Sequence, residues 1–440
     1  MNLGTALKWA LFFHGLVTEP RRVVAATAGR ALTDSLTRIA EKTDIVIISP
    51  AFLETGSRRG GGIEGNDYSS AIELSRLFRV TILSPFYRTF IGDIQVNRNL
   101  TIREVPLPAI GRFPPVRLAQ TAILTVLGWM FSVVMAAYVM REVMRGMRIL
   151  VVHNPETGLF ASLVSRLMGR LVLYSEGNTI PWVDPYLSPP KLRAVQKVWR
   201  KAMPSLGVLM CRIASAIRAQ SESIKRGMVS RQIEAEKVVV IPAGVDETEF
   251  PPGLFAYDTM KGLNVAFIGR LVEEKGAPLL VEVVQRAVVE SPTVSFSVFG
   301  EGPFGEPLSE LPNVIHLGAV SRDTLPGHLE KIHVVMSFQK EFGRAEIESL
   351  AAGKILLACR VGEVPLFIQH LDNGLLCEPN AKEVLKTLTA ILNQPALMPR
   401  IAREGRNLAL SRFAWKRVGE QWRMICSDLM AKDARNHDAF

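Results

Sequence analysis

The sequence predicts an α/β protein built from two doubly wound parallel-sheet domains. A length of 440 residues is too great for one compact domain and suits two of about 150 to 220 residues each. Short β-branched runs alternate with segments of helical periodicity, which is typical of parallel sheets covered by helices. The alternation restarts after the turn at 242–246, so each half of the chain is expected to form its own sheet.

The first half opens with a β-branched run at 44–50, which predicts a buried parallel strand. A glycine-rich loop at 60–65 and an apolar-periodic helix at 68–78 follow, and a second strand at 79–83 completes a βαβ unit. Further elements expected in this half are strands at 149–152 and 171–174 and a helix at 158–167.

The second half repeats this rhythm. Its expected strands are at 238–241, 261–267, 294–299, 334–338, 355–359 and 374–377, and its expected helices are at 278–289 and 345–352. In such folds ligands bind beyond the carboxyl ends of the strands, so the loops that follow the strands are the places to look for chemistry.

Composition excludes several classes of protein. Hydrophobic residues make up 48% and charged residues 21%, so the chain can bury large cores and is not disordered. Aromatic residues are only 7%, which argues against a stacking surface for single-stranded nucleic acid. The four cysteines are far apart and have no histidine nearby, which indicates buried thiols in a reducing compartment rather than disulfides or a zinc site.

Charge is divided unevenly along the chain. Residues 1–245 carry 31 Lys and Arg against 17 Asp and Glu, whereas the remainder is slightly acidic. A basic and apolar half favours contact with an anionic membrane surface or an acidic acceptor. Nucleic acid is less favoured as a partner, because the sequence has no long basic run and no aromatic-basic motif. The alternative is a basic surface with no partner.

Two segments raise the question of a membrane. The stretch 118–140 has no charged residue and is long enough to cross a bilayer. A span there would place the loop at 61–64 and the loop at 270–276 on opposite sides of the bilayer, which is excluded if both serve one active site. We therefore expect a helix that packs on the first sheet, with contact at the membrane interface left open. Residues 1–43 form an amphipathic extension, which either lies on a membrane or docks onto the first domain.

Four loops have the composition of anion or sugar sites. Gly61 and Gly62 let the backbone approach phosphate oxygens, although a plain flexible loop would have the same composition. Arg270 and Lys275 lie across a loop bracketed by glycines, where a guanidinium and an ammonium can hold a diphosphate. Solvated surface charge is the alternative interpretation of that pair.

The third loop leads into the helix at 345–352. Gly343 allows a tight turn, and Glu348 lies one turn into the helix, where a carboxylate can accept hydrogen bonds from ribose hydroxyls. Glu341 precedes the turn within reach of a sugar, whereas Glu346 is expected to stabilise the helix dipole. In the fourth loop, Gly362 follows a strand and can offer backbone amides to the same ligand.

These motifs together resemble a known family. Ile-Pro-Ala-Gly-Val-Asp at 241–246, Gly-Arg-Leu-(x3)-Lys-Gly at 269–276, Gly-Glu-Gly-Pro at 300–303, Phe-Gly-(x4)-Glu at 342–348 and Asn-Gly-Leu at 373–375 occur in the order found in retaining glycosyltransferases of the GT-B fold, family 4. The likeness extends over about residues 44–430. The tail Phe-Ala-Trp at 413–415 resembles the segment with which that family returns to its first domain.

The resemblance implies two Rossmann-like domains facing each other across a cleft. Residues 44–245 would bind the acceptor, residues 246–412 would bind a nucleotide-diphosphate sugar, and residues 413–440 would form the helix that crosses back. The expected donor-binding residues are Gly61, Gly62, Arg270, Lys275, Phe342, Gly343, Glu348 and Gly362. No metal and no cofactor besides the donor substrate is expected.

Three positions depart from the family pattern. Lys340 stands where the family has the first glutamate of a pair, and Glu341, displaced by one residue, is the candidate substitute. Glu176 stands where a catalytic-site histidine is common, which makes it the second candidate catalytic residue. Leu366 replaces a carboxylate that follows Pro365. The diphosphate end of the site therefore matches the family, while the sugar end is altered.

The leading hypothesis is a retaining glycosyltransferase of polysaccharide or glycolipid biosynthesis. Its acceptor would be a glycan or a lipid-linked glycan, and its location the cytoplasm, with peripheral contact at the inner face of the cell membrane. The alternative is a non-catalytic relative that binds nucleotide sugars or acts as a scaffold at the membrane. A hydrolysing or epimerising enzyme of the same fold ranks third. A dehydrogenase is disfavoured, because no GxGxxG follows the first strand closely.

Overall fold

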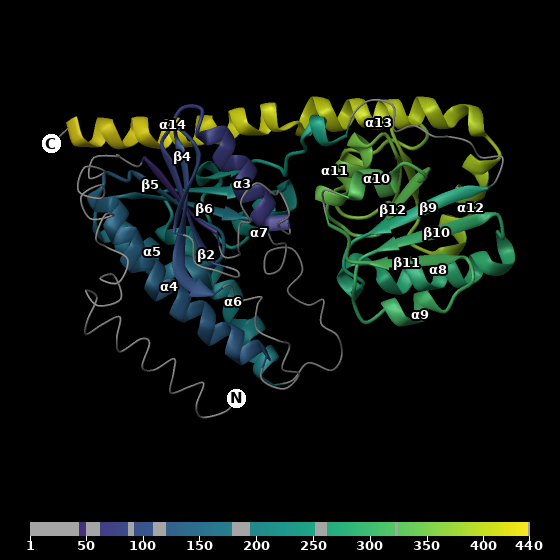
Figure 1. Ribbon diagram of the computed structural model, residues 1–440, viewed down its shortest axis with the longest axis horizontal. Coiled ribbons are helices and arrows are strands. Elements are labelled where there is room, and N and C mark those ends of the chain that lie inside the picture. The colour runs from purple at the N-terminus through teal and green to yellow at the C-terminus, as the bar shows by residue number, and fades with distance from the viewer. Residues whose placement is uncertain are drawn as a thin grey trace. The chain divides into compact units, whose positions relative to one another are not determined.

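The computed structural model describes residues 44–49, 62–86, 92–108, 120–177, 194–250, 262–321 and 324–438. Two parallel-sheet α/β domains are present in these residues (Figure 1), which confirms the predicted fold class. The predicted amphipathic extension at 1–43 lies outside the described residues, as does Gly61 of the glycine-rich loop.

The first sheet has eight strands in the order β3-β4-β2-β1-β5-β6-β7-β8. All neighbours pair in parallel except β3 and β4, which form an antiparallel edge. The strand bounds are β1 Ile45–Ile48, β2 Val80–Phe86, β3 Asp93–Asn97, β4 Leu100–Pro108, β5 Ile149–Val152, β6 Leu171–Glu176, β7 Ala216–Ala219 and β8 Val238–Val240.

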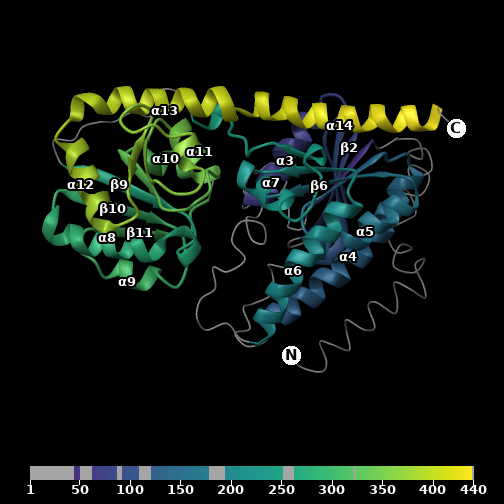
Figure 2. The ribbon, with the colours of Figure 1, turned by 180° about the vertical axis from the view of Figure 1, so that it is seen from behind.

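Both faces of the first sheet are covered, so its central strands are apolar on both sides. All four residues of β1 are buried. Val46 and Ile48 face one core, which they share with α4, α5, α6 and α7, whereas Ile45 and Ile47 face a second core formed with α3 and α14. Figure 2 shows the sheet from behind, with α3 and α14 near one another. The helix bounds are α3 Gly62–Leu74, α4 Gln120–Met144, α5 Pro155–Leu167, α6 Ala194–Ile213, α7 Glu222–Val229 and α14 Trp415–Asp438.

The uncharged stretch at 118–140 belongs largely to α4. Three of its described side chains, Phe131, Met135 and Val139, are buried in the core formed with the first sheet. Helix packing was the expected outcome for this segment. None of the helices in the described residues is both long enough and apolar enough to cross a membrane.

The second sheet has six strands in the order β11-β10-β9-β12-β13-β14, all parallel. Helices α8, α9 and α12 share a core with one face, whereas α10, α11 and the end of α13 share a core with the other. The bounds are β9 Leu263–Ile268, α8 Ala277–Glu290, β10 Val294–Phe299, α9 Gly305–Ser309, β11 Val314–Gly318, α10 Leu325–Leu329, β12 Val334–Ser337, α11 Arg344–Ala351, β13 Ile355–Cys359, β14 Leu375–Cys377, α12 Ala381–Leu392 and α13 Met398–Phe413.

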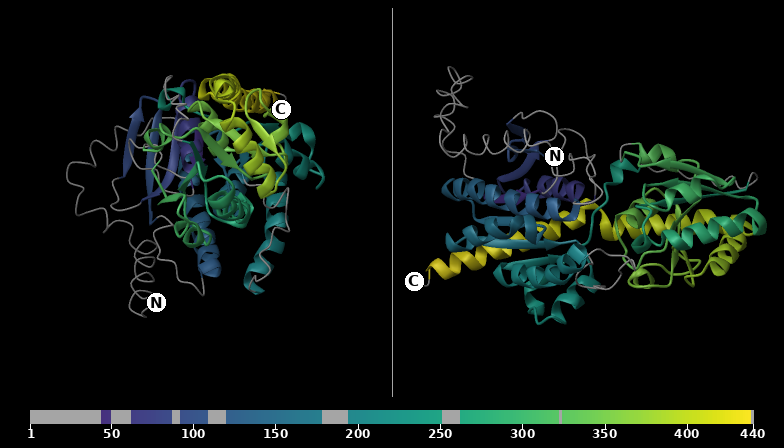
Figure 3. Two further views of the ribbon diagram at one scale, coloured as in Figure 1. Left: turned by 90° about the vertical axis from the view of Figure 1, so that its right-hand side faces the viewer. Right: turned by 90° about the horizontal axis from the view of Figure 1, so that it is seen from below.

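The last helix, α14, packs on the first sheet although it follows the second sheet in the sequence (Figure 3). Trp422 is fully buried there, and the Arg423 guanidinium lies 2.6 Å from the Glu73 carboxylate of α3. Where the chain enters α14, Val245 and Ala414 form an isolated parallel bridge. Hydrophobic burial and one well-shielded ion pair therefore fix α14 against α3.

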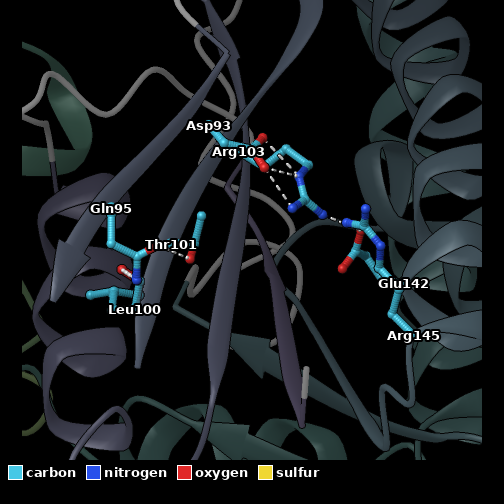
Figure 4. Close-up of polar contacts among 7 residues, drawn as sticks. All are labelled: Asp93, Gln95, Leu100, Thr101, Arg103, Glu142 and Arg145. Carbon is cyan, nitrogen blue, oxygen red and sulfur yellow. Dashed lines mark hydrogen bonds and ion pairs between the residues drawn. The ribbon is translucent and has the colours of Figure 1, made fainter. Parts of the chain in front are cut away.

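Strands β3, β4, β7 and β11 were not among the predicted elements. The edge pair β3–β4 is tied to α4 by a cluster of charges drawn in Figure 4. Arg103 of β4 donates to both Asp93 oxygens at 2.8 and 3.0 Å and also to Glu142 of α4, whose side chain is completely buried. Arg145 approaches the same Glu142 oxygen at 3.2 Å. Two cations therefore compensate one buried carboxylate.

All four cysteines are buried and unbridged, as the sequence predicted. Cys359 and Cys377 are register partners on β13 and β14. Burial raises the pKa of Cys211 to about 12, with the Glu176 charge adding to the effect, and burial raises the pKa of Cys426 to about 12. Thiols of this kind are poor nucleophiles.

Candidate functional site

Three of the four predicted loops follow neighbouring strands of the second sheet. Strands β9, β12 and β13 are adjacent and parallel, so the loops after them emerge at the same edge. Arg270 and Lys275 lie in the loop after β9, Phe342 and Gly343 in the loop after β12, and Gly362 in the loop after β13. The fold therefore places these predicted residues at one edge.

The loop after β9 runs close to the end of β12. Gly276 has φ +76°, and a Cβ there would lie 2.4 Å from Cβ of Phe338. Only glycine meets both conditions without strain, which explains the glycine at this position. The Arg270 side chain is 68% exposed and pairs with Glu274, so its guanidinium lies at the surface of the loop.

Lys275 is anchored to the loop after β12. Its ammonium donates to Oε1 of Gln339, and Nε2 of Gln339 donates to Oε1 of Glu346. The same Glu346 oxygen accepts from Ser337, while Oε2 accepts from the backbone N–H of Gly343 at 2.9 Å. The expected structural role of Glu346 is thus more extensive than helix-dipole stabilisation, because this carboxylate organises the whole turn. Sequence reasoning missed Gln339.

Phe342 and Gly343 shape that turn. The Phe342 ring is buried and stacks on Phe367 with 4.5 Å between ring centroids, and Phe413 packs against both rings. Gly343 is the N-cap of α11 and has extended backbone. Phe342 thereby fixes where the start of α11, and with it the N-terminal end of the helix dipole, is placed.

Glu348 is buried and lies next to a cation of its own helix. Nε of Arg344 lies 2.7 Å from Oε1 of Glu348. Burial raises the pKa of Glu348, and the charge and hydrogen bond of Arg344 act against that rise. A carboxylate held in this way is oriented before any ligand arrives.

The loop after β13 touches the loop after β12. Gly362 has φ +56°, and a Cβ there would lie 1.9 Å from the backbone oxygen of Lys340. The backbone N–H of Glu363 donates to the same oxygen at 2.9 Å. Lys340 is exposed, Glu341 is partly buried, and Leu366 is exposed. The altered positions of the second half therefore lie in these two contacting loops.

Glu176 lies on the first sheet, as the last residue of β6. It is buried, and the Tyr174 hydroxyl donates to its Oε2 at 2.5 Å. Gly62 is the first residue of α3.

A buried polar row crosses the carboxyl edge of the first sheet and was not predicted. Ser175 and Arg218 are register partners on β6 and β7, and His153 directly follows β5. Nε2 of His153 lies 2.6 Å from Oδ1 of Asp67 on α3, and both side chains are buried. Arg218 donates to the Ile241 carbonyl at 2.6 Å and lies over the Trp422 ring. The sequence could have indicated this row, because His153 and Arg218 lie at or near the carboxyl ends of apolar strands.

No group of three or more His, Cys, Asp or Glu side chains in the described residues is arranged to hold a metal ion.

Part of the chain matches a known protein family. Residues 262–394 match the family Glycosyl transferases group 1, and this stretch contains the three converging loops. Over 383 residues the chain is 25% identical to a phosphatidylinositol N-acetylglucosaminyltransferase component of Arabidopsis thaliana, covering 83% of this chain and 78% of the relative.

Solved structures show the same architecture. Sucrose-phosphate synthase from Thermosynechococcus elongatus superposes with a TM-score of 0.68 at 17% identity, covering 89% of this chain and all of the other. The Anabaena protein HepE, solved with UDP and glucose, superposes with a TM-score of 0.61 at 17% identity, covering 88% and 99%. These likenesses confirm the GT-B fold class. The family match and the Arabidopsis relative support a glycosyltransferase.

Proposed function

We propose that this protein is a retaining glycosyltransferase that moves a sugar from a nucleotide-diphosphate sugar to a glycan or lipid-linked acceptor. The observation that carries the proposal is the meeting of the loops after β9, β12 and β13 at one sheet edge. These loops and α11 supply two cations, Arg270 and Lys275, and a pre-oriented carboxylate, Glu348. Cations suit a diphosphate and a carboxylate suits ribose hydroxyls.

In the proposed reaction the bond between the sugar C1 and the diphosphate oxygen breaks, and the acceptor oxygen bonds to C1 on the same face. The proton of the acceptor hydroxyl passes to the departing phosphate. Arg270 and Lys275 stabilise the charge that develops on the diphosphate, which lowers the barrier because this charge is greater in the transition state than in the bound substrate. Such a route needs no protein nucleophile.

A lipid-linked acceptor is favoured by the named relative and by the surface of the first domain. The Arabidopsis relative is named as acting on phosphatidylinositol. Adjacent helices α4 and α5, with the C-cap residue of α5, expose seven large apolar side chains, which we call the α4/α5 stripe: Val133, Met140, Met144, Phe160, Leu163, Leu167 and Met168. Leu167 is 87% exposed. Exposed apolar patches of this kind mark interaction sites.

Arginines flank the stripe, which suits an anionic bilayer. Arg141 and Arg166 are exposed, and Arg145 and Arg170 are partly exposed. We expect the full chain to sediment with vesicles that contain phosphatidylglycerol, less so as salt rises, and Leu167→Glu to weaken that binding. Val289→Glu on α8 is the matched control, because Val289 is 83% exposed on the second domain. Equal binding by both variants would remove the stripe from the proposal.

One observation favours a second function, a non-catalytic protein that binds nucleotide sugars at the membrane. Lys340 occupies the position of a family glutamate, so the sugar end of the site differs from that of the family. If the protein does transfer a sugar, Glu341→Gln and Lys340→Ala show which of the two residues contacts it. Loss of transfer in Glu341→Gln alone would assign the sugar contact to Glu341, and loss in Lys340→Ala alone would assign it to the lysine.

The proposed function is tested by measuring nucleoside diphosphate released from UDP-, GDP- and ADP-sugars, with and without membrane extract of the source cells. Release that requires the extract and disappears in Glu348→Ala would support transfer and identify the donor. Nucleotide binding without release under any condition would favour the non-catalytic function. Glu176→Gln is included, because a loss of release without a loss of nucleotide binding would give this residue a role in chemistry.

A further inference from the structure

Gln339 links a cation to a buried carboxylate without letting the two pair. The Lys275 ammonium can only donate hydrogen bonds, and the Glu346 carboxylate, when ionised, can only accept them. The amide between them must therefore turn its oxygen toward Lys275 and its NH₂ toward Glu346, which is the orientation present. A glutamine is suited to this position because it carries both an acceptor and a donor at its tip.

This arrangement leaves the positive charge of Lys275 available to a ligand, because no carboxylate of the described residues offsets it. In the described part of the chain Lys275 contacts the neutral amide and pairs with no carboxylate, whereas Arg270 in the same loop pairs with Glu274. A direct pair with Glu346 would offset the ammonium charge. The amide instead holds the ammonium in place while adding no charge of its own.

The far end of the link is rigid. Glu346 and Ser337 are buried, and the Glu346 carboxylate accepts hydrogen bonds from Ser337, Gln339 and the Gly343 backbone. Gln339 is itself buried, two residues after the end of β12. The Gln339 amide therefore holds the Lys275 ammonium at a fixed position relative to the start of α11.

We propose that Gln339 is a positioning residue that holds the Lys275 ammonium, uncompensated by a carboxylate, for the diphosphate of the donor. This inference rests on the proposed function, because it takes the diphosphate as the ligand of Lys275. It adds a residue outside the motifs that indicated the site.

Isosteric variants test the proposal by calorimetric titration with UDP, GDP and ADP, using the one that the wild type binds most tightly. Gln339→Met removes both hydrogen bonds, and we expect about tenfold weaker binding. Gln339→Glu places a carboxylate against the ammonium, so binding should weaken at least as much. In the double variant with Lys275→Met, the loss should equal that of Lys275→Met alone, because Gln339 acts through the lysine.

Ser295→Ala is the matched control, since it removes a hydrogen bond to Asn264 at the start of β9, at the opposite edge of the same sheet from Lys275. It should lower the melting temperature while leaving nucleotide affinity within about twofold. Unchanged affinity in Gln339→Met, beside a loss in Lys275→Met, would overturn the role of Gln339 and leave the proposed function standing. Losses that multiply in the double variant would also overturn it. Unchanged affinity in Lys275→Met would instead refute the diphosphate assignment.

Discussion

Nε of Arg344 lies 2.7 Å from Oε1 of Glu348, one turn further along α11. The pair fixes the carboxylate, and the burial that surrounds it raises the pKa of Glu348. A glutamate meant to accept ribose hydroxyls must be ionised, so protonation should weaken binding at a higher pH than for an ordinary glutamate.

We therefore expect Glu348→Gln to bind the preferred nucleoside diphosphate about tenfold more weakly than the wild type near neutral pH. The difference should shrink as pH falls, because only the wild type loses a carboxylate. Titration calorimetry at several pH values measures this ratio, and the exposed Glu282→Gln on α8 is the control. A ratio independent of pH would contradict the ribose assignment.

Arg103 should be required for stability of the first domain. Arg103→Met removes one of the two arginines that pair with the fully buried Glu142, and we expect the free energy of unfolding to fall by about 3–5 kcal/mol. Arg98→Met, at an exposed turn, should change it by less than about 0.5 kcal/mol. Urea unfolding measures both. The double change Arg103→Met with Glu142→Met should recover much of the loss, since the buried carboxylate is then removed together with the arginine.

Gly362 should resist substitution more than Gly327 of the same domain. Gly362→Ala combines a left-handed backbone with a Cβ 1.9 Å from the Lys340 oxygen, so the two contacting loops must move apart. We expect a loss of at least about 1–2 kcal/mol in stability together with weaker nucleotide binding. Gly327→Ala on α10 meets no atom within 4 Å and should be neutral or slightly stabilising. Equal effects would refute the steric argument.

The cysteine thiols should be unreactive in the native protein. Burial raises the pKa of Cys211 and of Cys426 to about 12 each, so both remain protonated at pH values where a free thiol ionises. A chromogenic disulfide reagent at about pH 8 should react with them only after denaturant is added. A raised folded-state pKa also means that their stabilising contribution is complete below the unfolded pKa of about 8.5 and is lost as pH rises above it. Cys211→Ala with Cys426→Ala should flatten that alkaline loss.

Much of the fold could be predicted because its central strands are short and apolar on both faces. Strands β5, β10 and β13 have the predicted bounds, and each is a continuous run with no competing periodicity. Edge strands were harder to predict. β3 alternates exposed and partly buried residues, and its pairing with β4 depends on a partner that sequence alone does not identify.

Within the candidate site, the sequence identified residues whose own charge and local motif indicate their chemistry. Arg270 and Lys275 carry charge in a loop bracketed by glycines, and Glu348 lies in the helix that follows Gly343. The doubly wound fold predicted that ligands would bind at the loops after the strands. Gln339 carries no charge and lies in no recognisable spacing. Its role exists only because β12 brings its amide between an ammonium from one loop and a carboxylate from α11.

By itself, then, the sequence determined the two-sheet architecture, the loops that carry cations, and the burial of the thiols, because these follow from local hydrophobicity and glycine placement. The tertiary structure decided which charges meet. Arg344 rather than Arg270 faces Glu348, His153 meets Asp67, and Arg103 reaches Glu142 from a strand 39 residues away. Such pairs depend on strand order and helix rotation, since an ion pair forms wherever two side chains are brought within a few ångströms, whatever their separation along the chain.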